Sequence, residues 1–183
     1  MTQASIRPAA AACLAGERIG DCEARKENGL DRIERVREKM DRVIRGLAGE
    51  NEKRDACIHL YGVSQFCAMI AMKRGVNVEL AVIAGMMHDI YTYSAGETKD
   101  HAHKGAEMAR QVLISMGSFE DGEVEQICSA VYHHSSKKKK HGELDEVLKD
   151  ADVFQHCIYH PGALAADKER ERWEALKREF GIR

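Results

Sequence analysis

The two prolines of this 183-residue chain, Pro8 and Pro161, lie close to its ends, so the long stretch between them contains none. Proline fixes φ and lacks a backbone N–H, and a stretch without it can form helix without interruption. The stretch shows no convincing alternation of apolar and polar residues, and aromatic residues make up only 5% of the chain. The sequence therefore predicts an all-α fold, a bundle of about six to eight helices.

Apolar residues spaced three and four positions apart predict where these helices lie. The expected helices cover residues 30–46, 51–74, 78–87, 100–116, 119–134, 143–160 and 164–180. Residues 1–29 show little periodicity, so we expect a short helix or an N-terminal arm there. Residues 30–183 are expected to form a single helical domain.

An ionisable pair directly follows a long apolar segment in the third expected helix. Eight consecutive apolar or small residues, Leu80 to Met87, come just before His88 and Asp89. Burying an unpaired carboxylate costs several kcal/mol, so Asp89 needs an arginine, solvent at the helix end or a metal ion as its partner. Imidazole next to carboxylate suits divalent ions, although a His-Asp pair by itself is more commonly a partly exposed helix terminus.

Two other expected helices carry residues of the same chemistry. His59 lies within the apolar stripe of the helix over 51–74, where a single histidine is most often a core residue. Asp150 and Asp152 lie on the two flanks of the apolar side of the helix over 143–160. Periodicity does not choose between them, and either fits a carboxylate on a helix surface.

Taken together, these segments resemble the HD-domain superfamily of metal-dependent phosphohydrolases, whose signature is His, then His-Asp, then Asp on separate helices. The matching positions are His59, His88 with Asp89, and Asp152, within the segments HLYGVSQFCAMIA, AVIAGMMHDI and LKDADVFQH. The last segment is similar to the family's final ligand segment, which favours Asp152 over Asp150. The resemblance covers roughly residues 51–160 and implies an HD-domain-like helical bundle.

Two further segments resemble the ligand segments of two-metal members of that superfamily. In HAHKGAEMARQVL, the histidine four residues ahead of the Gly-Ala step is His101, with His103 as the near alternative. In ICSAVYHHSSK, the spacing favours His134 over His133. The resemblance then implies one or two divalent transition-metal ions, which could be manganese, iron, nickel, cobalt or zinc.

The resemblance also implies a reaction, the hydrolysis of a phosphomonoester, a phosphodiester or a nucleotide phosphoanhydride by a metal-bound hydroxide. In this scheme the first ion is held by His59, His88, Asp89 and Asp152, and the second by His101 and His134 with Asp89 as the bridge. His88 and Asp89 are the expected catalytic residues, and Asp89 also orients the nucleophile. His103, His133 and Lys104 are the candidates for the group that protonates the leaving group, and the sequence does not choose among them.

One departure from the superfamily pattern narrows the activity. After His-Asp the chain reads Ile-Tyr-Thr-Tyr, where members that cleave cyclic dinucleotides carry Gly-Lys, and their later Gly-Tyr-Pro motif is absent from the sequence. That branch is therefore disfavoured. Two alternative functions share the fold, namely oxidation of a small molecule by a di-iron member and a non-catalytic module that binds a metal or a nucleotide.

Composition limits the partners. Lysine and arginine number 28 against 30 acidic residues, and the net charge of −2 argues against a protein that coats nucleic acid. No apolar run approaches the roughly 20 residues that cross a bilayer, and the six cysteines form no C-x-x-C pair. We expect a cytoplasmic protein with reduced thiols that acts on a small phosphorylated substrate, with a nucleotide as one candidate. We expect no nucleic-acid or membrane partner and leave homo-oligomerisation open.

Two features near the expected site have simpler explanations. His156 lies four residues after Asp152 on the same helix face, where packing is a commoner role than support of a ligand. The run Lys137 to Lys140 is the only low-complexity segment. We expect it to form a solvated, mobile loop, which beside a phosphate site could attract an anionic substrate.

Overall fold

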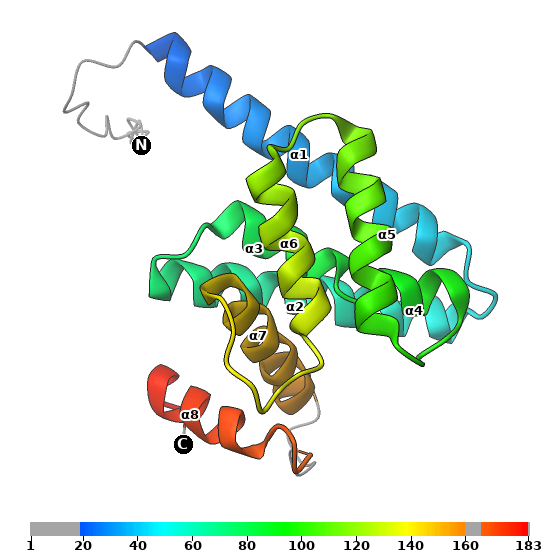
Figure 1. Ribbon diagram of the computed structural model, residues 1–183, viewed down its shortest axis with the longest axis vertical. Helices are drawn as coiled ribbons and strands as arrows, with labels where there is room; N and C mark the ends of the chain where they lie inside the picture. The colour runs from blue at the N-terminus through cyan, green and yellow to red at the C-terminus, as the bar shows by residue number, and fades with distance from the viewer. Residues whose placement is uncertain (1–18, 160–165, 183) are drawn as a thin grey trace, which may run out of the picture.

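The computed structural model describes residues 19–159 and 166–182, with side chains from residue 32 onward, and this part of the chain contains eight α-helices and no strand (Figure 1). The helices are α1 (Ile19–Arg45), α2 (Glu50–Arg74), α3 (Val78–Met87), α4 (Ile90–Ala95), α5 (His101–Met116), α6 (Asp121–His133), α7 (Glu143–Tyr159) and α8 (Arg170–Phe180). The expected all-α bundle is confirmed. Within the described residues, no helix is both long enough and apolar enough to cross a membrane.

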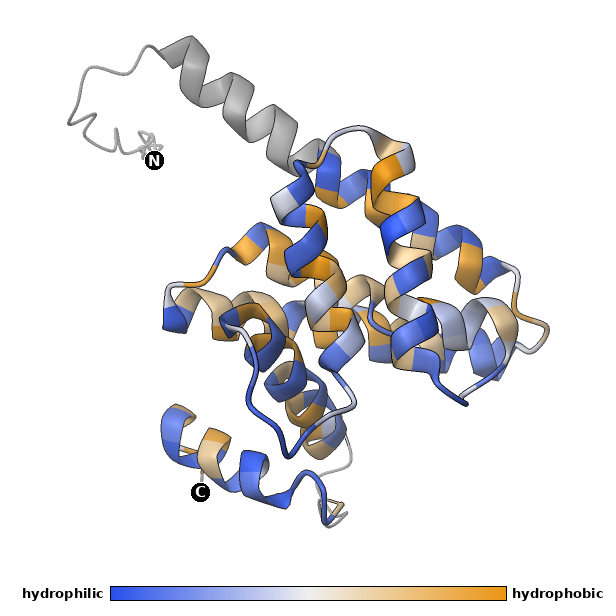
Figure 2. Cartoon of the chain, in the orientation of Figure 1, coloured by the Kyte–Doolittle hydropathy of each residue, from blue (hydrophilic) through white to orange (hydrophobic). Residues whose placement is uncertain are grey.

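The most hydrophobic helix, α3, lies at the centre of the bundle, whereas α8 is largely hydrophilic (Figure 2). Helices α1, α2, α6 and α7 all pack against α3. Its buried residues are Leu80, Ala81, Ile83, Ala84, Gly85, Met86 and Met87. The apolar segment before His88 is therefore a central helix covered on all sides, and it places the ionisable pair in the middle of the molecule.

Helices α2 and α3 approach each other closely at Gly85. A Cβ atom there would lie 2.7 Å from Ser64 Cα of α2, closer than side-chain atoms pack, so only glycine fits. Across the same contact the Ser64 hydroxyl donates a hydrogen bond to the Val82 carbonyl oxygen at 3.0 Å. This contact sets the separation between the helices that carry His59 and His88.

The helices depart from the expected ranges in three places. Helix α1 begins at Ile19 rather than Leu30, because no proline interrupts this segment and a helix extends more easily than it nucleates. Helix α8 begins at Arg170, later than expected, and α4 was not expected because six residues are too few for periodicity to reveal. Residues 1–18 of the expected arm and residues 160–165 lie outside the described part of the chain.

Helix α8 is fastened to the bundle by two arginines. Arg172 donates to Asp150 Oδ1 and to Glu146 Oε2 of α7, both at 2.8 Å. Arg74 of α2 lies 2.7 Å from Asp150 Oδ2 and 2.7 Å from Glu179 of α8. Both oxygens of Asp150 are therefore occupied by arginines, and this carboxylate serves the packing of α2, α7 and α8.

Candidate metal centre

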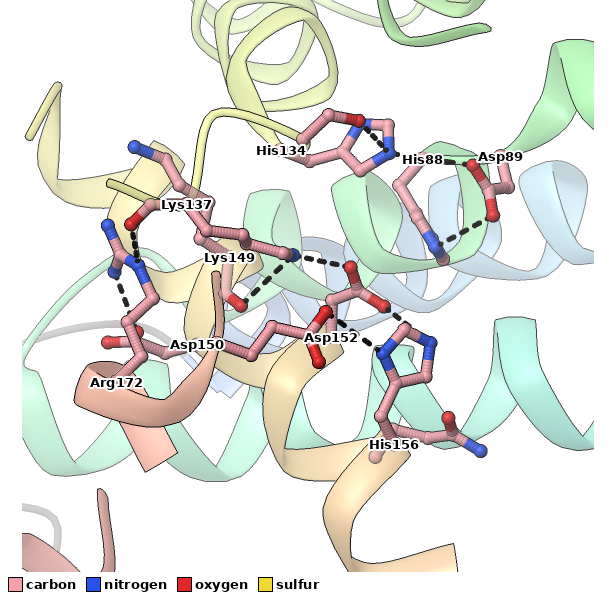
Figure 3. A network of polar contacts seen from close by, with 12 residues as sticks. His88, Asp89, His134, Lys137, Lys149, Asp150, Asp152, His156 and Arg172 are labelled. Carbon is pink, nitrogen blue, oxygen red and sulfur yellow. Dashed lines mark hydrogen bonds and ion pairs between the residues drawn. The ribbon is translucent and has the colours of Figure 1, made fainter. Parts of the chain in front are cut away.

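The carboxylate of Asp89 lies between two pairs of histidines. Its Oδ2 lies 3.5 Å from Nε2 of both His59 and His88. Its Oδ1 lies 3.5 Å from Nε2 of both His101 and His134. Within each pair the two Nε2 atoms are 3.0 Å and 3.1 Å apart. Each oxygen of the carboxylate therefore faces its own histidine pair, and Figure 3 shows Asp89 beside one member of each, His88 and His134.

These residues reach the centre from different helices. His59 lies on α2, His101 is the first residue of α5, and His134 caps the C-terminal end of α6. His88 caps the end of α3 and Asp89 precedes α4, so the pair occupies the break between the two helices. Successive residues inside one helix do not face the same point, and this break allows both side chains to do so.

The four histidines share one hydrogen-bonding pattern. In each ring, Nδ1 lies 2.6–3.0 Å from an oxygen that can only accept a hydrogen bond. The acceptors are the side-chain oxygen of Gln155 for His59 and the backbone oxygens of Gly85, Thr98 and Val131 for His88, His101 and His134. In the neutral form of each ring Nδ1 therefore carries the proton, and Nε2 presents its lone pair to the centre. Acceptors placed in this way orient histidines that ligate metals.

Two carboxylate oxygens at the centre are buried without a hydrogen bond. Asp89 Oδ1 and Asp152 Oδ1 have no hydrogen-bond partner among the described residues. Asp152 Oδ1 lies 3.8 Å from His59 Nε2, so it faces the same centre. Converging anionic oxygens and imidazole lone pairs repel one another unless a cation lies among them. The donors therefore fit a divalent metal ion held by nitrogen and oxygen, without thiolate.

Burial and neighbouring charges hold the carboxylates ionised and His88 neutral. Burial by itself would raise the pKa of Asp89, but the neighbouring imidazoles, that of His88 first, hold it well below its usual range. Burial is likewise outweighed at Asp152, whose pKa is lowered chiefly by the ammonium of Lys137. Burial lowers the pKa of His88 to about 4. At neutral pH these three groups are in the protonation states that bind metal ions.

Of the two candidate histidines at the start of α5, the structure brings His101 to the centre. His103 is exposed, and its Nδ1 lies 2.7 Å from the carboxylate of Asp100. The ammonium of Lys104, another candidate proton donor, lies 3.3 Å from Glu97. His103 and Lys104 are thus both paired with neighbouring carboxylates.

The structure also separates the other two pairs of candidates. His134 faces the centre, whereas Nδ1 of His133 lies 2.8 Å from Asp145. Asp152 faces the centre, whereas Asp150 is held by the arginines that fasten α8. The residues favoured by the family resemblance are therefore the ones that converge.

A second group with metal-ligand chemistry, formed by His133, His141 and Asp145, is satisfied without a cation. His133 and the Ser129 hydroxyl both donate to Asp145 Oδ2, at 2.8 Å and 3.0 Å. Nδ1 of His141 accepts a hydrogen bond from Lys149 at 2.6 Å. The rings of His133 and His141 are stacked 3.8 Å apart with planes inclined by 12°, so their lone pairs do not meet at one point. This group therefore lacks the converging, unbonded ligand atoms that mark the Asp89 centre.

Two residues that the sequence analysis did not single out contact the histidines. The Ser135 hydroxyl is exposed and lies 3.1 Å from His101 Nε2 and 3.3 Å from His134 Nε2. Gln155 holds the ring of His59 from α7. A polar amide on the apolar side of a helix was the available signal for Gln155, whereas nothing in the sequence distinguishes Ser135 from other loop serines.

The expectation of a solvated lysine loop is wrong for Lys137. This residue is only 5% exposed, and its Nζ donates a hydrogen bond to Asp152 Oδ2 at 2.5 Å (Figure 3). Lys138, Lys139 and Lys140 are exposed, as expected. The side chain of Lys137 turns inward because Asp152 provides a buried anion, and a paired charge is tolerated in an interior where a single one is not.

His156 stands at the edge of the centre, beside a pocket. Its Nε2 lies 3.4 Å from Asp152 Oδ1, and its ring stacks on that of His59 with centroids 5.2 Å apart. Its Nδ1 lies 3.5 Å from Glu169. A pocket of about 350 Å³ opens here, lined by Asp55, Ile58, His59, Tyr93, Gln155, His156 and Tyr159. His156 therefore contacts two residues of the centre, and the pocket reaches the centre at His59.

Comparison with known proteins gives consistent matches. Residues 57–156 match the HD domain family, and this segment contains every residue of the centre. A protein of Bacillus subtilis (strain 168) named putative phosphohydrolase YueE is 30% identical over 129 residues, which cover 62% of this chain and 73% of that protein. Ribonuclease Y of Petrotoga mobilis (strain DSM 10674 / SJ95) is 28% identical over 123 residues, which cover 67% of this chain but 20% of the ribonuclease.

A solved structure shares the fold. The crystal structure of a predicted HD superfamily hydrolase from an uncultured Thermotogales bacterium aligns with a TM-score of 0.54 and 22% identity. The alignment covers 79% of this chain and 88% of that chain. At this level of identity the likeness concerns the arrangement of helices.

Proposed function

The chain belongs to the HD-domain family, and on that premise we propose that it is a metal-dependent phosphohydrolase acting on a phosphomonoester, a phosphodiester or a nucleotide phosphoanhydride. One divalent ion would be held by His59, His88, Asp89 and Asp152, and a second by His101, His134 and Asp89. The observation that carries this proposal is the position of Asp89, whose two oxygens each lie 3.5 Å from a different histidine pair.

When bound, divalent ions at such a centre lower the pKa of a water molecule towards neutrality and polarise a phosphoryl oxygen. The folded chain supplies histidine rings that are already oriented for binding. Because Nδ1 of every ring is already held by an acceptor, the Nε2 atoms need no rearrangement to act. The exposed hydroxyl of Ser135, beside His101 and His134, is placed to donate a hydrogen bond to a phosphate oxygen of the substrate.

The pocket beside His59 supports a small substrate. Its volume of about 350 Å³ lies at the lower end of the range for small-molecule sites. Tyr93 and Tyr159 offer aromatic walls, and His156 and Asp55 offer polar groups. We therefore propose a small phosphate ester, with a nucleotide as one candidate. The absence of nucleic-acid and membrane partners and the cytoplasmic location stay predictions.

The proposal is tested by metal analysis followed by a substrate panel. The protein is purified with a chelator, reloaded separately with manganese, iron, nickel, cobalt or zinc, and assayed on phosphomonoesters, phosphodiesters and nucleotides. We expect metal-dependent hydrolysis that falls to about 1% or less in Asp89→Asn, which keeps the size of the side chain but removes its charge. A metal-loaded protein that hydrolyses no compound of the panel would refute the proposal. Oxygen uptake by the iron form instead would favour the di-iron oxidation alternative.

A further inference from the structure

Lys137 is a buried cation whose side chain ends on a proposed metal ligand. The side chains of Lys137 and Asp152 are only 2% and 7% exposed, and the ammonium donates a hydrogen bond to Asp152 Oδ2 at 2.5 Å. The ammonium also lies 3.4 Å from the backbone oxygen of Lys149. A charge-assisted hydrogen bond between two buried groups holds both of them firmly.

The two oxygens of Asp152 therefore have different surroundings. Oδ2 is taken by Lys137, whereas Oδ1 has no hydrogen-bond partner among the described residues and faces His59 and His156 at 3.8 Å and 3.4 Å. A carboxylate with two free oxygens can bind one ion through both. With Oδ2 bonded to an ammonium, Asp152 has one oxygen left to offer.

The backbone around Lys137 is fixed by neighbouring helices. Arg172 of α8 donates to the carbonyl oxygen of Lys137 at 2.5 Å and to that of Lys139 at 3.3 Å. Lys149 of α7 donates to the same oxygen of Lys139 at 2.9 Å. Figure 3 shows this chain of contacts from Arg172 through Lys137 to Asp152. Helix α8 lies outside the segment 57–156 that matches the family, yet it sets the position of a group inside the centre.

We propose that Lys137 is a positioning residue that keeps Asp152 a one-oxygen metal ligand, so that a coordination position at the first ion stays open for water and substrate. Catalytic metal sites need such an open position, and a second carboxylate oxygen would fill it. The part of this proposal that concerns turnover rests on the proposed function. The part that concerns coordination does not.

The test compares Lys137→Met with Lys138→Met, whose side chain is exposed on the same loop. Removing the buried ammonium frees Asp152 Oδ2 and removes a charge that repels the ion. Metal affinity, measured by competition with a chelator, should therefore stay equal or become tighter. In the same variant kcat should fall by about ten- to a hundred-fold with little change in KM. Lys138→Met should match the wild type in both.

A second readout does not depend on activity. The visible absorption of bound Co²⁺ weakens as its coordination number rises, so the Co²⁺ form of Lys137→Met should absorb less than those of the wild type and Lys138→Met. Lys137→Gln, which keeps a polar head too short to hold Oδ2, should show the same change and serves if the Met variant does not fold.

Two results would overturn the proposal. One is an unchanged Co²⁺ spectrum together with an unchanged kcat. The other is a parallel loss of metal affinity and activity, which indicates a purely structural ion pair. If the metal-loaded wild type hydrolyses no phosphate ester, the proposed function fails, while the Co²⁺ comparison still decides whether Lys137 restrains Asp152.

Discussion

The Nε2 atoms of His59 and His88 lie 3.0 Å apart, and both rings keep their proton on the opposite nitrogen, Nδ1. When both rings are neutral, two lone pairs at this separation repel each other, and Asp89 adds negative charge 3.5 Å from both. The folded chain therefore holds an arrangement that is unfavourable by itself and that a divalent cation relieves.

Metal binding should consequently stabilise the fold. A ligand that binds only the folded state at a hundred times its Kd adds about 2.7 kcal/mol to the free energy of unfolding. We expect a higher Tm with a suitable transition metal than with a chelator, measured by thermal unfolding. His88→Gln should lose most of this difference, whereas His103→Ala, on an exposed residue, should keep it. A Tm that responds to none of the five candidate metals would contradict this expectation.

The two histidine pairs should hold separate ions. His101→Ala removes a donor from one pair only, so the protein should retain one ion instead of two when metal content is measured after dialysis. His103→Ala is the matched control because it lies two residues away on the same helix and should retain both. Equal metal content in the two variants would rule out the assignment of His101.

The close contact between α2 and α3 should be sensitive to one methyl group. In Gly85→Ala the added Cβ meets Ser64 Cα at 2.7 Å, so backbone must move, and we expect a loss of about 1–3 kcal/mol in the free energy of unfolding. Metal affinity should fall with it, because His59 and His88 are carried by these helices. In Gly122→Ala of α6 the added atom meets nothing within 4 Å, so stability should rise by up to about 1 kcal/mol. Urea unfolding of both variants checks this contrast.

Much of this arrangement was predictable from the sequence. Long helices have apolar residues three and four positions apart along one face, and this spacing can be read from the sequence. Helices α2, α3, α5, α6 and α7 accordingly lie close to their expected ranges. The resemblance to the HD-domain superfamily, rather than spacing alone, predicted that His59, His88 with Asp89, and Asp152 would meet. Helix α4 escaped prediction because its six residues leave no measurable period.

The roles of the remaining site residues follow from tertiary contacts, which the sequence by itself does not reveal. A run of four lysines reads as a solvated loop, and only the buried carboxylate of Asp152 explains why Lys137 turns inward. Ser135 contacts two histidines because its loop follows α6, and loop serines carry no periodic signal. Periodicity did not choose between Asp150 and Asp152, and the family resemblance favoured Asp152. The structure adds the reason, because Arg172 holds Asp150.

The ion pairs of Arg32 should make the packing of α1 depend on pH. Arg32 donates to Glu79 of α3 at 2.8 Å and to Glu123 of α6 at 2.7 Å. Its hydrogen bond lowers the pKa of Glu123 from the ordinary value of 4.5. The folded pKa lies below the unfolded one, so this stabilisation is present above pH 4.5 and is lost as the pH falls below it.

Arg32→Met should therefore cost about 1–2 kcal/mol at pH 7 and clearly less at about pH 3.5, because the wild type loses the same interaction in acid. Urea unfolding of the two proteins at both pH values measures the difference. A difference of the same size at both values would show that Arg32 acts through packing alone.

The two-ion centre is tested by the anomalous scattering of crystals grown with Mn²⁺. We expect two peaks on opposite sides of Asp89, one beside His59, His88 and Asp152 and the other beside His101 and His134. Crystals with no peak at either position, or with Mn²⁺ only at His133, His141 and Asp145, would contradict it.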